Sequence, residues 1–464
     1  MTLHIHDTAT RSLREFKPLR PGLASIYVCG ATVQSEPHIG HMRSAIAFDI
    51  LRRWLTYSSY QVTLVRNVTD IDDKILTKSR EVDEAWWAWA YLNERRFDSA
   101  YTELGVIPPT YEPRATGHIP EMIDLMERLI ESGHAYATEE GNVYFDVSSW
   151  PNYGALSGQR VDEMQGAETT TPGKRDPRDF ALWKCARPGE PSWATPWGPG
   201  RPGWHLECSA MAAKYCGSQF DIHGGGLDLV FPHHENEIAQ SQAAGDGFAS
   251  YWMHNNWVTT AGEKMSKSLG NSLLVSELTK HTRPIELRYY MGAAHYRSML
   301  EFSPKALEEA ATGFRRIESF VRRATAVSGG VNPSDYQVPD IFAQAMDDDL
   351  GVPAALAVLH DQVTRGNDAL ARKEDVSELL GQVRVMCTVL GVDPLDPIWS
   401  RDDNPRAENA LDQVVQYLLA ERTAARSERD FDTADAIRSV LAKSGLAIED
   451  GADGSTWSFD ESGD

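Results

Sequence analysis

The sequence predicts an α/β protein with a parallel sheet in its first part and a bundle of helices in its second part. Two β-type runs, Ile26-Tyr27-Val28 and Val62-Thr63-Leu64-Val65, flank residues 42–55, whose apolar side chains recur at helical spacing. A strand, a helix and a strand in this order form a βαβ unit with parallel strands and a right-handed crossover. From Ser303-Pro304 onward the pattern is helical almost to the end, beginning with an N-cap serine and a proline in the first turn.

Length and composition are those of a globular protein. The 464 residues correspond to about three domains. No apolar run reaches the ~18 residues of a membrane span, and the first residues, MTLHIHD, lack the basic and apolar regions of a secretory signal. The five cysteines include no C-x-x-C pair, which is typical of a reducing compartment. We therefore expect a cytoplasmic protein without a membrane partner.

The net charge of −22 repels polyanions at long range. A nucleic-acid partner is therefore not indicated by the charge, and its binding would need local basic patches that the sequence does not locate in space.

The rest of the first part continues the alternation of helices and strands. Helical patterns cover residues 80–104 and 119–132, and the tryptophans in the first of them are expected in the core. Residues 138–203 are dense in Gly, Pro and Thr, which predicts an irregular inserted segment. The tryptophans expected in the core are Trp86, Trp87 and Trp89. After the inserted segment, we expect a strand at Phe220-Asp221-Ile222, a turn at Gly224-Gly225-Gly226 and a helix from His233 to Ala244.

The second part contains two apolar stripes at helical spacing and two linkers. The linkers are expected at residues 329–333 and 393–405, and residues 405–464 are expected to form a small unit of two helices and a flexible tail. The stripes consist of Phe314, Ile317, Phe320, Val321 and Ala324, and of Leu379, Leu380, Val383, Met386 and Leu390.

A first phosphate-binding motif is Pro37-His38-Ile39-Gly40-His41, which follows the first strand and begins the first helix. The N-terminus of a helix offers free N–H groups and the positive end of its dipole, which suit phosphates. Gly40 has no side chain, so adenine can pack against the backbone there. His38 and His41 are placed to donate hydrogen bonds to a triphosphate.

A second motif is Gly262-Glu263-Lys264-Met265-Ser266-Lys267-Ser268-Leu269-Gly270-Asn271. Its lysines and serines, between glycines, predict a mobile loop that closes over phosphates. Nucleotidyl transfer needs positioning and electrostatic stabilisation of the departing pyrophosphate rather than covalent chemistry. Together, His-Ile-Gly-His and Lys-Met-Ser-Lys-Ser in this order resemble the paired signatures of class I aminoacyl-tRNA synthetases. The resemblance implies a Rossmann-like catalytic domain and ATP binding, with Mg²⁺, by His38, Gly40, His41, Lys264, Ser266 and Lys267.

A metal site is a further hypothesis. Cys29, Cys208, His233 and Glu237 have side chains that zinc accepts as ligands, and His233 and Glu237 share a helix face at i and i+4. From spacing alone the set stays open, because Cys216, His205, His223 and His234 compete for the same role. An Mg²⁺ site at Asp70, Asp72 and Asp73 is less expected than a turn that caps the next helix.

Several stretches resemble the cysteinyl-tRNA synthetase family over essentially the whole chain. They are Tyr27-Val28-Cys29-Gly30, Asn67-Val68-Thr69-Asp70-Ile71-Asp72-Asp73-Lys74, Gly203-Trp204-His205-Leu206-Glu207-Cys208-Ser209-Ala210-Met211, Phe231-Pro232-His233-His234-Glu235-Asn236-Glu237-Ile238-Ala239-Gln240 and Asp347-Asp348-Asp349-Leu350.

That resemblance implies one zinc ion held by Cys29, Cys208, His233 and Glu237. It also implies an amino-acid pocket of Cys29, Thr69, Trp204 and Asp228, in which Asp228 receives the α-ammonium group. A zinc ion distinguishes cysteine from serine, because a thiolate is a strong soft ligand and a neutral hydroxyl is not. The loop before His38 departs from the family pattern at Ala31 and Gln34, which puts only the shape of that loop in doubt.

The resemblance divides the chain into functional domains. Residues 1–120 and 200–230 form the Rossmann-like catalytic domain, 121–199 an inserted connective segment, 231–303 a stem-contact region that carries the lysine loop, and 304–404 a helical bundle. Residues 405–464 correspond to a small anticodon-binding domain. Its expected tRNA contacts are Arg426, Asp435, Asp450 and Trp457.

The expected function is cysteine–tRNA ligation by a monomer: activation of L-cysteine with ATP, then transfer to tRNA(Cys). The alternative on the same fold is the actinobacterial ligase that joins cysteine to an amino sugar in mycothiol biosynthesis, but a small acceptor has no use for residues 405–464. A catalytically dead RNA-binding regulator is disfavoured by the intact His38, His41, Lys264 and Lys267. A structural zinc module would leave both phosphate motifs without a purpose.

Overall fold

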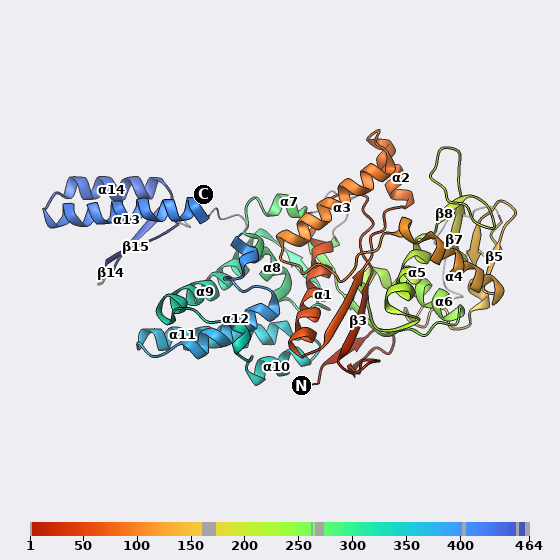
Figure 1. The fold of residues 1–464 in the computed structure, drawn as a ribbon, viewed down its shortest axis with the longest axis horizontal. Coiled ribbons are helices and arrows are strands. Elements are labelled where there is room, and N and C mark those ends of the chain that lie inside the picture. Colours follow the sequence, from red (N-terminus) through yellow and green to blue (C-terminus); the bar gives the residue numbers. More distant parts are fainter. Residues whose placement is uncertain are drawn as a thin grey trace. The chain divides into compact units, whose positions relative to one another are not determined.

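A computed structural model describes residues 2–159, 173–260, 263–264, 273–400, 405–451 and 454–459 of the chain. The chain divides into two compact units, Met1–Pro394 and Leu395–Asp464, which are drawn in Figure 1. Each unit is described by itself below.

The centre of unit 1 is a four-stranded parallel sheet. Its strands are β3 (Leu23–Val28), β4 (Gln61–Arg66), β9 (Gln219–Gly226) and β10 (Phe248–Asn255), in the order β10-β9-β3-β4. The predicted βαβ unit is confirmed, with α1 (Ile39–Tyr57) between β3 and β4. The strand order reverses between β3 and β9, and ligands bind at such switch points beyond the carboxyl ends of the strands.

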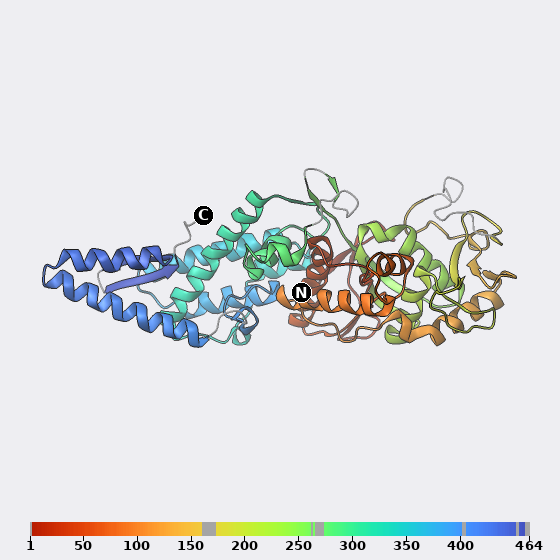
Figure 2. The same ribbon diagram turned by 90° about the horizontal axis from the view of Figure 1, so that it is seen from above.

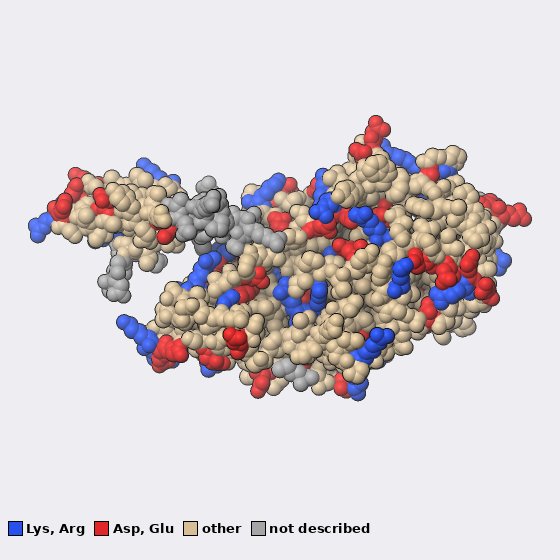
Figure 3. Space-filling model, in the orientation of Figure 1, with Lys and Arg blue, Asp and Glu red and all other residues tan. Residues whose placement is uncertain are grey.

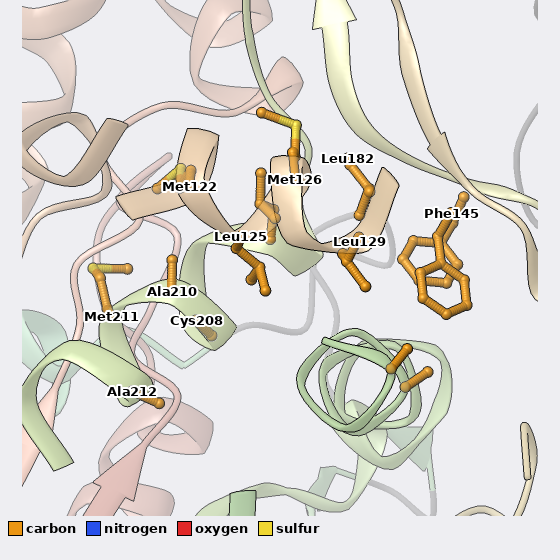
Figure 4. Packing of buried hydrophobic residues seen from close by; sticks show 14 of the residues in the cluster. Met122, Leu125, Met126, Leu129, Phe145, Leu182, Cys208, Ala210, Met211 and Ala212 are labelled. Atoms are coloured by element: carbon orange, nitrogen blue, oxygen red, sulfur yellow. The ribbon is translucent and has the colours of Figure 1, made fainter. Parts of the chain in front are cut away.

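One face of this sheet is covered by α5 (Trp204–Cys216), on which α4 (Ile119–Glu131) packs, and the two helices share one large apolar cluster. Figure 4 shows side chains from these two helices packed together with Phe145 and Leu182. The amphipathic spacing of α4 explains this arrangement, because Met122, Leu125, Met126 and Leu129 all lie on its buried side.

The inserted segment is more regular than the sequence predicted. Four antiparallel strands form a second sheet in the order β5-β6-β7-β8. The prediction of an irregular segment was wrong here because three of these strands have only three residues, too few to show a period of two. The strands are β5 (Ala135–Ala137), β6 (Val143–Phe145), β7 (Phe180–Cys185) and β8 (Gly200–Pro202).

Two further expectations were wrong. Gly224-Gly225-Gly226 is not a turn but the end of β9, and glycine is needed there because a Cβ atom at Gly224 would collide with the ring of Phe48. The tryptophans of α3 (Trp86–Glu103) are not core residues: Trp87 is 63% exposed, and Trp86 and Trp89 are only half-buried. The buried side of α3 begins at Ala90 instead.

The rest of unit 1 is helical, as predicted. Ser303 caps α9 by accepting a hydrogen bond from the Ala306 amide, with Pro304 in the first turn. The predicted stripes lie in the core, except for Leu379, which is half-buried. The helices are α8 (Pro284–Ala293), α9 (Pro304–Ser328), α10 (Asp340–Asp347), α11 (Val352–Ala371) and α12 (Ser377–Leu390).

Within unit 1, the parallel sheet lies between the β5–β8 sheet and these helices, as Figure 2 shows. Charges of both signs are interspersed on the face drawn in Figure 3. The smaller elements of unit 1 are β1 (His4–Asp7), β2 (Ser12–Glu15), α2 (Asp73–Glu81), α6 (Glu235–Ala243), β11 (Val258–Thr260), β12 (Glu263–Lys264), α7 (Val275–Leu278) and β13 (Leu300–Phe302).

Unit 2 contains α13 (Pro405–Ser427) and α14 (Phe431–Lys443), the two helices that the sequence predicted. They are followed by a hairpin of β14 (Leu446–Gly451) and β15 (Gly454–Phe459), which the sequence analysis did not predict, and most of the tail expected after Trp457 lies outside the described residues. A small core of Val415, Leu419, Leu441 and Leu446 holds these elements together. None of the described helices in either unit is long and apolar enough to cross a membrane.

Candidate active site

A cavity of about 340 Å³ lies at the switch point of the parallel sheet. Residues at the carboxyl ends of three strands line it: Cys29 after β3, Asp228 after β9, and Asn255 at the end of β10. The first turn of α1 lines it as well. The cavity is therefore where this topology places a ligand.

The two histidines of the first motif have fixed roles at the start of α1. The His38 Nδ1 atom accepts a hydrogen bond from the Gly40 amide at 3.1 Å, and the His41 Nδ1 atom accepts one from the His38 amide at 3.2 Å. The two rings are stacked with centroids 3.8 Å apart. Because Nδ1 accepts in both rings, the ring proton is on Nε2. His38 and His41 are therefore donors at Nε2, as a phosphate ligand requires.

A cluster of potential metal ligands lies beside the cavity. One ligand atom each from Cys29, Cys208, His233 and Glu237 lies within 4.8 Å of the other three. The Cys29 Sγ atom is 3.2 Å from the Glu237 Oε1 atom, and the His233 Nε2 atom is 3.0 Å from the same oxygen. The structure thus brings together all four residues of the hypothesis: Cys29 follows β3, Cys208 lies on α5, His233 lies in the turn before α6, and Glu237 lies on α6.

A second group meets the same criterion: Cys29 and Glu237 with His223 and His234. Of the other competitors, His205 lies against His233, with the two Nδ1 atoms 3.0 Å apart. His205 and Cys216 belong to neither group that the described residues form. The geometry therefore leaves two possible sets of metal ligands, and both contain Cys29 and Glu237.

Cys29, Cys208 and His233 line the cavity, whereas His223 and His234 are buried behind it. An ion held by the first group is therefore the one that a ligand in the cavity can reach.

Burial and the pairing of its members set the protonation of the cluster. Burial raises the pKa of the Cys29 thiol well above its usual range. Burial also opposes ionisation of Cys208, but hydrogen bonds with Cys29 and His233 outweigh it and lower the pKa of Cys208 to about 6. Burial acts against the charge of His233 too, yet the Glu237 carboxylate raises its pKa to about 10. Burial opposes the charge of Glu237 as well, but the neighbouring histidines hold the pKa of its carboxyl group well below its usual range. Without an ion, the cluster thus holds a Cys208 thiolate, a His233 imidazolium and a Glu237 carboxylate.

The residues expected around the amino acid also line the cavity. Trp204 stacks on His233, and Thr69 is buried with its hydroxyl donating to the Glu207 Oε2 atom at 3.0 Å. Asp228 is exposed at the cavity wall. Thr69, Trp204 and Asp228 are thus within one cavity with Cys29.

The loop before α1 is held by its backbone. The Trp89 indole donates to the Gln34 carbonyl at 2.9 Å, and the Thr69 amide donates to the Ala31 carbonyl at 3.3 Å. Neither contact uses the side chains that depart from the family pattern. Asp72 caps α2 by accepting from the Lys74 amide at 2.8 Å, which confirms the predicted turn.

The second motif is described only at its start. The backbone of Lys264 pairs with Thr259 as part of β12, while Ser266 and Lys267 lie outside the described residues.

The residues expected to contact tRNA all belong to unit 2. Arg426 on α13 and Asp435 on α14 are exposed, and the backbone of Asp450 pairs with Ser455 in the hairpin. The indole of Trp457 donates to the Asp412 Oδ1 atom at 2.9 Å and packs against the small core.

The sequence analysis missed Asn67 and Glu207, which lie behind the cavity wall and are buried. A signal was present, because a buried carboxylate beside Cys208 in a helix of otherwise mostly apolar residues needs a polar partner.

Three family models match the chain. Residues 15–312 match the catalytic domain of class I (C) tRNA synthetases, residues 341–393 the DALR domain, and residues 408–457 the cysteinyl-tRNA ligase anticodon binding domain. The first match covers more than half of the chain and includes the sheet and the cavity. Fold and site thus define a class I aminoacyl-tRNA synthetase.

The cysteine–tRNA ligase of Streptomyces griseus is 59% identical over 465 residues, which cover 99% of both chains. That of Streptomyces coelicolor is 57% identical over 464 residues, which cover 99% of this chain and 76% of the relative. The chain therefore belongs to the cysteine–tRNA ligase family.

Solved structures with the same fold include two other synthetases. The methionyl-tRNA synthetase of Mycobacterium tuberculosis in complex with methionyl-adenylate has a TM-score of 0.59 at 14% identity, covering 80% of this chain and 92% of that chain. The LeuRS of Agrobacterium radiobacter in a ternary complex has a TM-score of 0.57 at 12% identity, covering 83% of this chain and 85% of that chain. At such identity the likeness concerns the fold alone.

Proposed function

We propose that this chain activates L-cysteine with ATP and transfers it to the 3′ end of tRNA(Cys). The observation that carries the proposal is the position of two thiols and an imidazole in the same cavity as the first turn of α1. One end of the cavity offers sulfur and nitrogen ligands for a metal, and the other offers donors for phosphates. Aminoacyl-adenylate formation needs both ends within reach of one substrate.

The donor set of Cys29, Cys208, His233 and Glu237 fits a zinc ion, because zinc prefers thiolate and imidazole ligands and accepts a carboxylate. When bound, the ion supplies a soft Lewis acid that favours a thiolate over a hydroxyl. We favour this group over the one with His223 and His234, since Cys208 and His233 line the cavity and those histidines do not.

At the nucleotide end, His38 and His41 donate from Nε2 to the phosphates, and Gly40 leaves room for adenine. Lys264, Ser266 and Lys267 are proposed to close over ATP and its Mg²⁺. Their charge stabilises the pyrophosphate as it leaves, so that catalysis is electrostatic.

At the amino-acid end, the Asp228 carboxylate attracts the α-ammonium group of cysteine. Trp204 and Thr69 complete the pocket on the side of the metal ligands. This arrangement orients the substrate carboxylate away from Asp228, because like charges repel at short range.

The acceptor is proposed to be tRNA rather than an amino sugar. The match of residues 408–457 to an anticodon binding domain supports this choice, since a small acceptor would not need such a domain. In unit 2, Arg426 is proposed to contact phosphate or a base edge, Asp435 and Asp450 base amino groups, and Trp457 a base by stacking.

Metal content and ATP–pyrophosphate exchange with cysteine and serine test the proposal directly. We expect one zinc per chain and exchange with cysteine but not serine. Cys208→Ser should lower zinc occupancy and cysteine activation together, while Cys216→Ser changes neither, because Cys216 belongs to neither ligand group although it lies on the same helix. Zinc-loaded protein without cysteine-dependent exchange would contradict the proposal.

A further inference from the structure

A buried chain of hydrogen bonds joins the loops after β3 and β4 to helix α5. The Gly30 amide donates to the Asn67 Oδ1 atom at 2.8 Å, the Asn67 Nδ2 atom donates to the Thr69 Oγ1 atom at 3.2 Å, and that hydroxyl donates to the Glu207 Oε2 atom at 3.0 Å. Asn67, Thr69 and Glu207 are each at most 1% exposed. These side chains are therefore shielded from bulk water, which does not compete for their hydrogen bonds.

The direction of each bond follows from the one before it. A backbone amide can only donate, so the oxygen of the Asn67 side chain must face Gly30. The NH₂ group of Asn67 then faces Thr69, and because it too can only donate, the Thr69 oxygen must accept. The single hydroxyl proton of Thr69 is left for Glu207.

Thr69 lines the cavity, whereas Asn67 and Glu207 are not among its lining residues. With its proton given to Glu207 and one lone pair used by Asn67, the Thr69 oxygen keeps one lone pair for a ligand. While Glu207 accepts this proton, Thr69 presents an acceptor to the cavity. Such a group binds an ammonium and rejects a carboxylate.

The carboxyl group of Glu207 is only partly satisfied by its hydrogen bond with Thr69. Within the described part of the chain, its second oxygen, Oε1, is buried without a hydrogen-bond partner. A buried polar atom without a partner costs stability, so its presence calls for a functional explanation.

We infer that Glu207 is a positioning residue that orients the Thr69 hydroxyl so that its oxygen accepts a hydrogen bond from the α-ammonium group of the substrate. Thr69 and Asp228 then offer two acceptors to one cation. The site thereby selects thiols that carry an amine. This inference rests on the proposed function, because it concerns how that site recognises cysteine.

The test compares cysteine with 3-mercaptopropionate, a thiol of similar size that lacks the amino group. In Glu207→Leu we expect the KM for cysteine in pyrophosphate exchange to rise about tenfold or more, since a hydrogen bond to a charged group is lost. We expect kcat to change little and the inhibition constant of 3-mercaptopropionate to stay the same. Glu207→Gln should restore most of the KM, because its amide oxygen can accept the Thr69 proton.

Thr69 provides a second route to the same result and covers the case in which Glu207→Leu fails to fold. Thr69→Val removes the hydroxyl at nearly constant volume and should raise the KM for cysteine as Glu207→Leu does, while Thr69→Ser should not. The double variant Thr69→Val/Glu207→Leu should be no worse than either single variant, because both act through one bond. Glu286→Ala, which removes a buried carboxylate bonded to Arg315 outside the cavity, is the control.

The inference would be overturned by an unchanged KM for cysteine in Glu207→Leu, by an equal loss for 3-mercaptopropionate, or by a loss of metal from this variant that accounts for the effect. Additive losses in the double variant would do so as well. A failure of the proposed function would look different, because metal-loaded wild-type protein would then show no cysteine-dependent exchange at all.

Discussion

The indole of Trp204 stacks on the imidazole of His233, with ring centroids 4.3 Å apart and 17° between the ring planes. The two nitrogens of that imidazole are also held, since Nδ1 lies 3.0 Å from the Nδ1 atom of His205 and Nε2 lies 3.0 Å from Glu237. Trp204 therefore fixes the plane of the His233 ring, as residues outside the ligand set commonly do for a metal-binding histidine.

Trp204→Ala should weaken zinc binding by about 10–100-fold, which is the usual cost of losing a residue that orients a ligand. The KM for cysteine should rise with it, and Trp204→Phe should recover part of the loss through ring stacking. Competition with a chelator measures the affinity. Trp87→Ala is the control, because Trp87 is 63% exposed on α3. Equal zinc affinity in Trp204→Ala and wild type would refute this role.

A buried ion pair ties α1 to α8. The Arg288 Nη2 atom lies 2.5 Å from the Asp49 Oδ2 atom, and both side chains are at most 1% exposed. Arg288→Met should lower the free energy of unfolding by about 3 kcal/mol, at the low end of the usual cost of breaking a buried pair, because Asp49 keeps its ion pair with Arg53. Urea unfolding followed by tryptophan fluorescence measures the effect. Arg95→Met, in a mostly exposed pair with Asp98, should cost no more than about 1 kcal/mol. Similar midpoints for the two variants would contradict this prediction.

His254 should make the fold sensitive to acid. It is buried between Thr8 and His234, and burial lowers its pKa to about 3, with the nearby His223 adding to this and Glu237 opposing it. Below pH 6.5 the unfolded chain binds a proton at this residue and the folded chain does not. The free energy of unfolding should therefore fall by up to about 1.4 kcal/mol per pH unit between about pH 6 and pH 3.

In His254→Asn the free energy of unfolding should fall less steeply over this acid range. Above about pH 7.5 the difference in this free energy between variant and wild type should stay constant, because His254 is then neutral in both the folded and the unfolded chain. Denaturant unfolding at pH 8, 6 and 5 supplies the comparison. Parallel pH profiles for the variant and wild type would show that His254 does not contribute.

Removal of unit 2 should separate the two half-reactions. A chain that ends at Pro394 retains the sheet, the cavity and the proposed ligands, so it should keep cysteine-dependent pyrophosphate exchange. Charging of tRNA should fall by at least about tenfold, because even one lost stacked base is worth that much. Aminoacylation with tRNA(Cys) transcript measures this, and equal charging by the shortened chain would exclude unit 2 from recognition.

The parallel sheet and the helices could be predicted from the sequence because their patterns are local. Residues 42–55 and the stripe from Phe314 to Ala324 repeat over several turns. The β5–β8 sheet could not be predicted in this way, since most of its strands have three residues and are held by partners far along the chain. Trp87 was misplaced because hydrophobicity says nothing about which face of α3 lies outward.

The candidate site divides in the same way. His38 and His41 belong to one contiguous motif. The metal ligands depended on the family resemblance, because spacing left eight residues open and the structure itself still forms two groups around Cys29 and Glu237. The bond between Thr69 and Glu207 spans 138 positions, and no local pattern announces such a contact.

The distance along the chain between Cys29 and Glu237, 208 positions, has a consequence for biosynthesis. A ribosome that has made the first half of the chain has released only part of the ligand set. Any ion that this set holds must be acquired after α6 has emerged and Glu237 lies beside Cys29, so loading with metal reports that the chain has been made at least as far as α6.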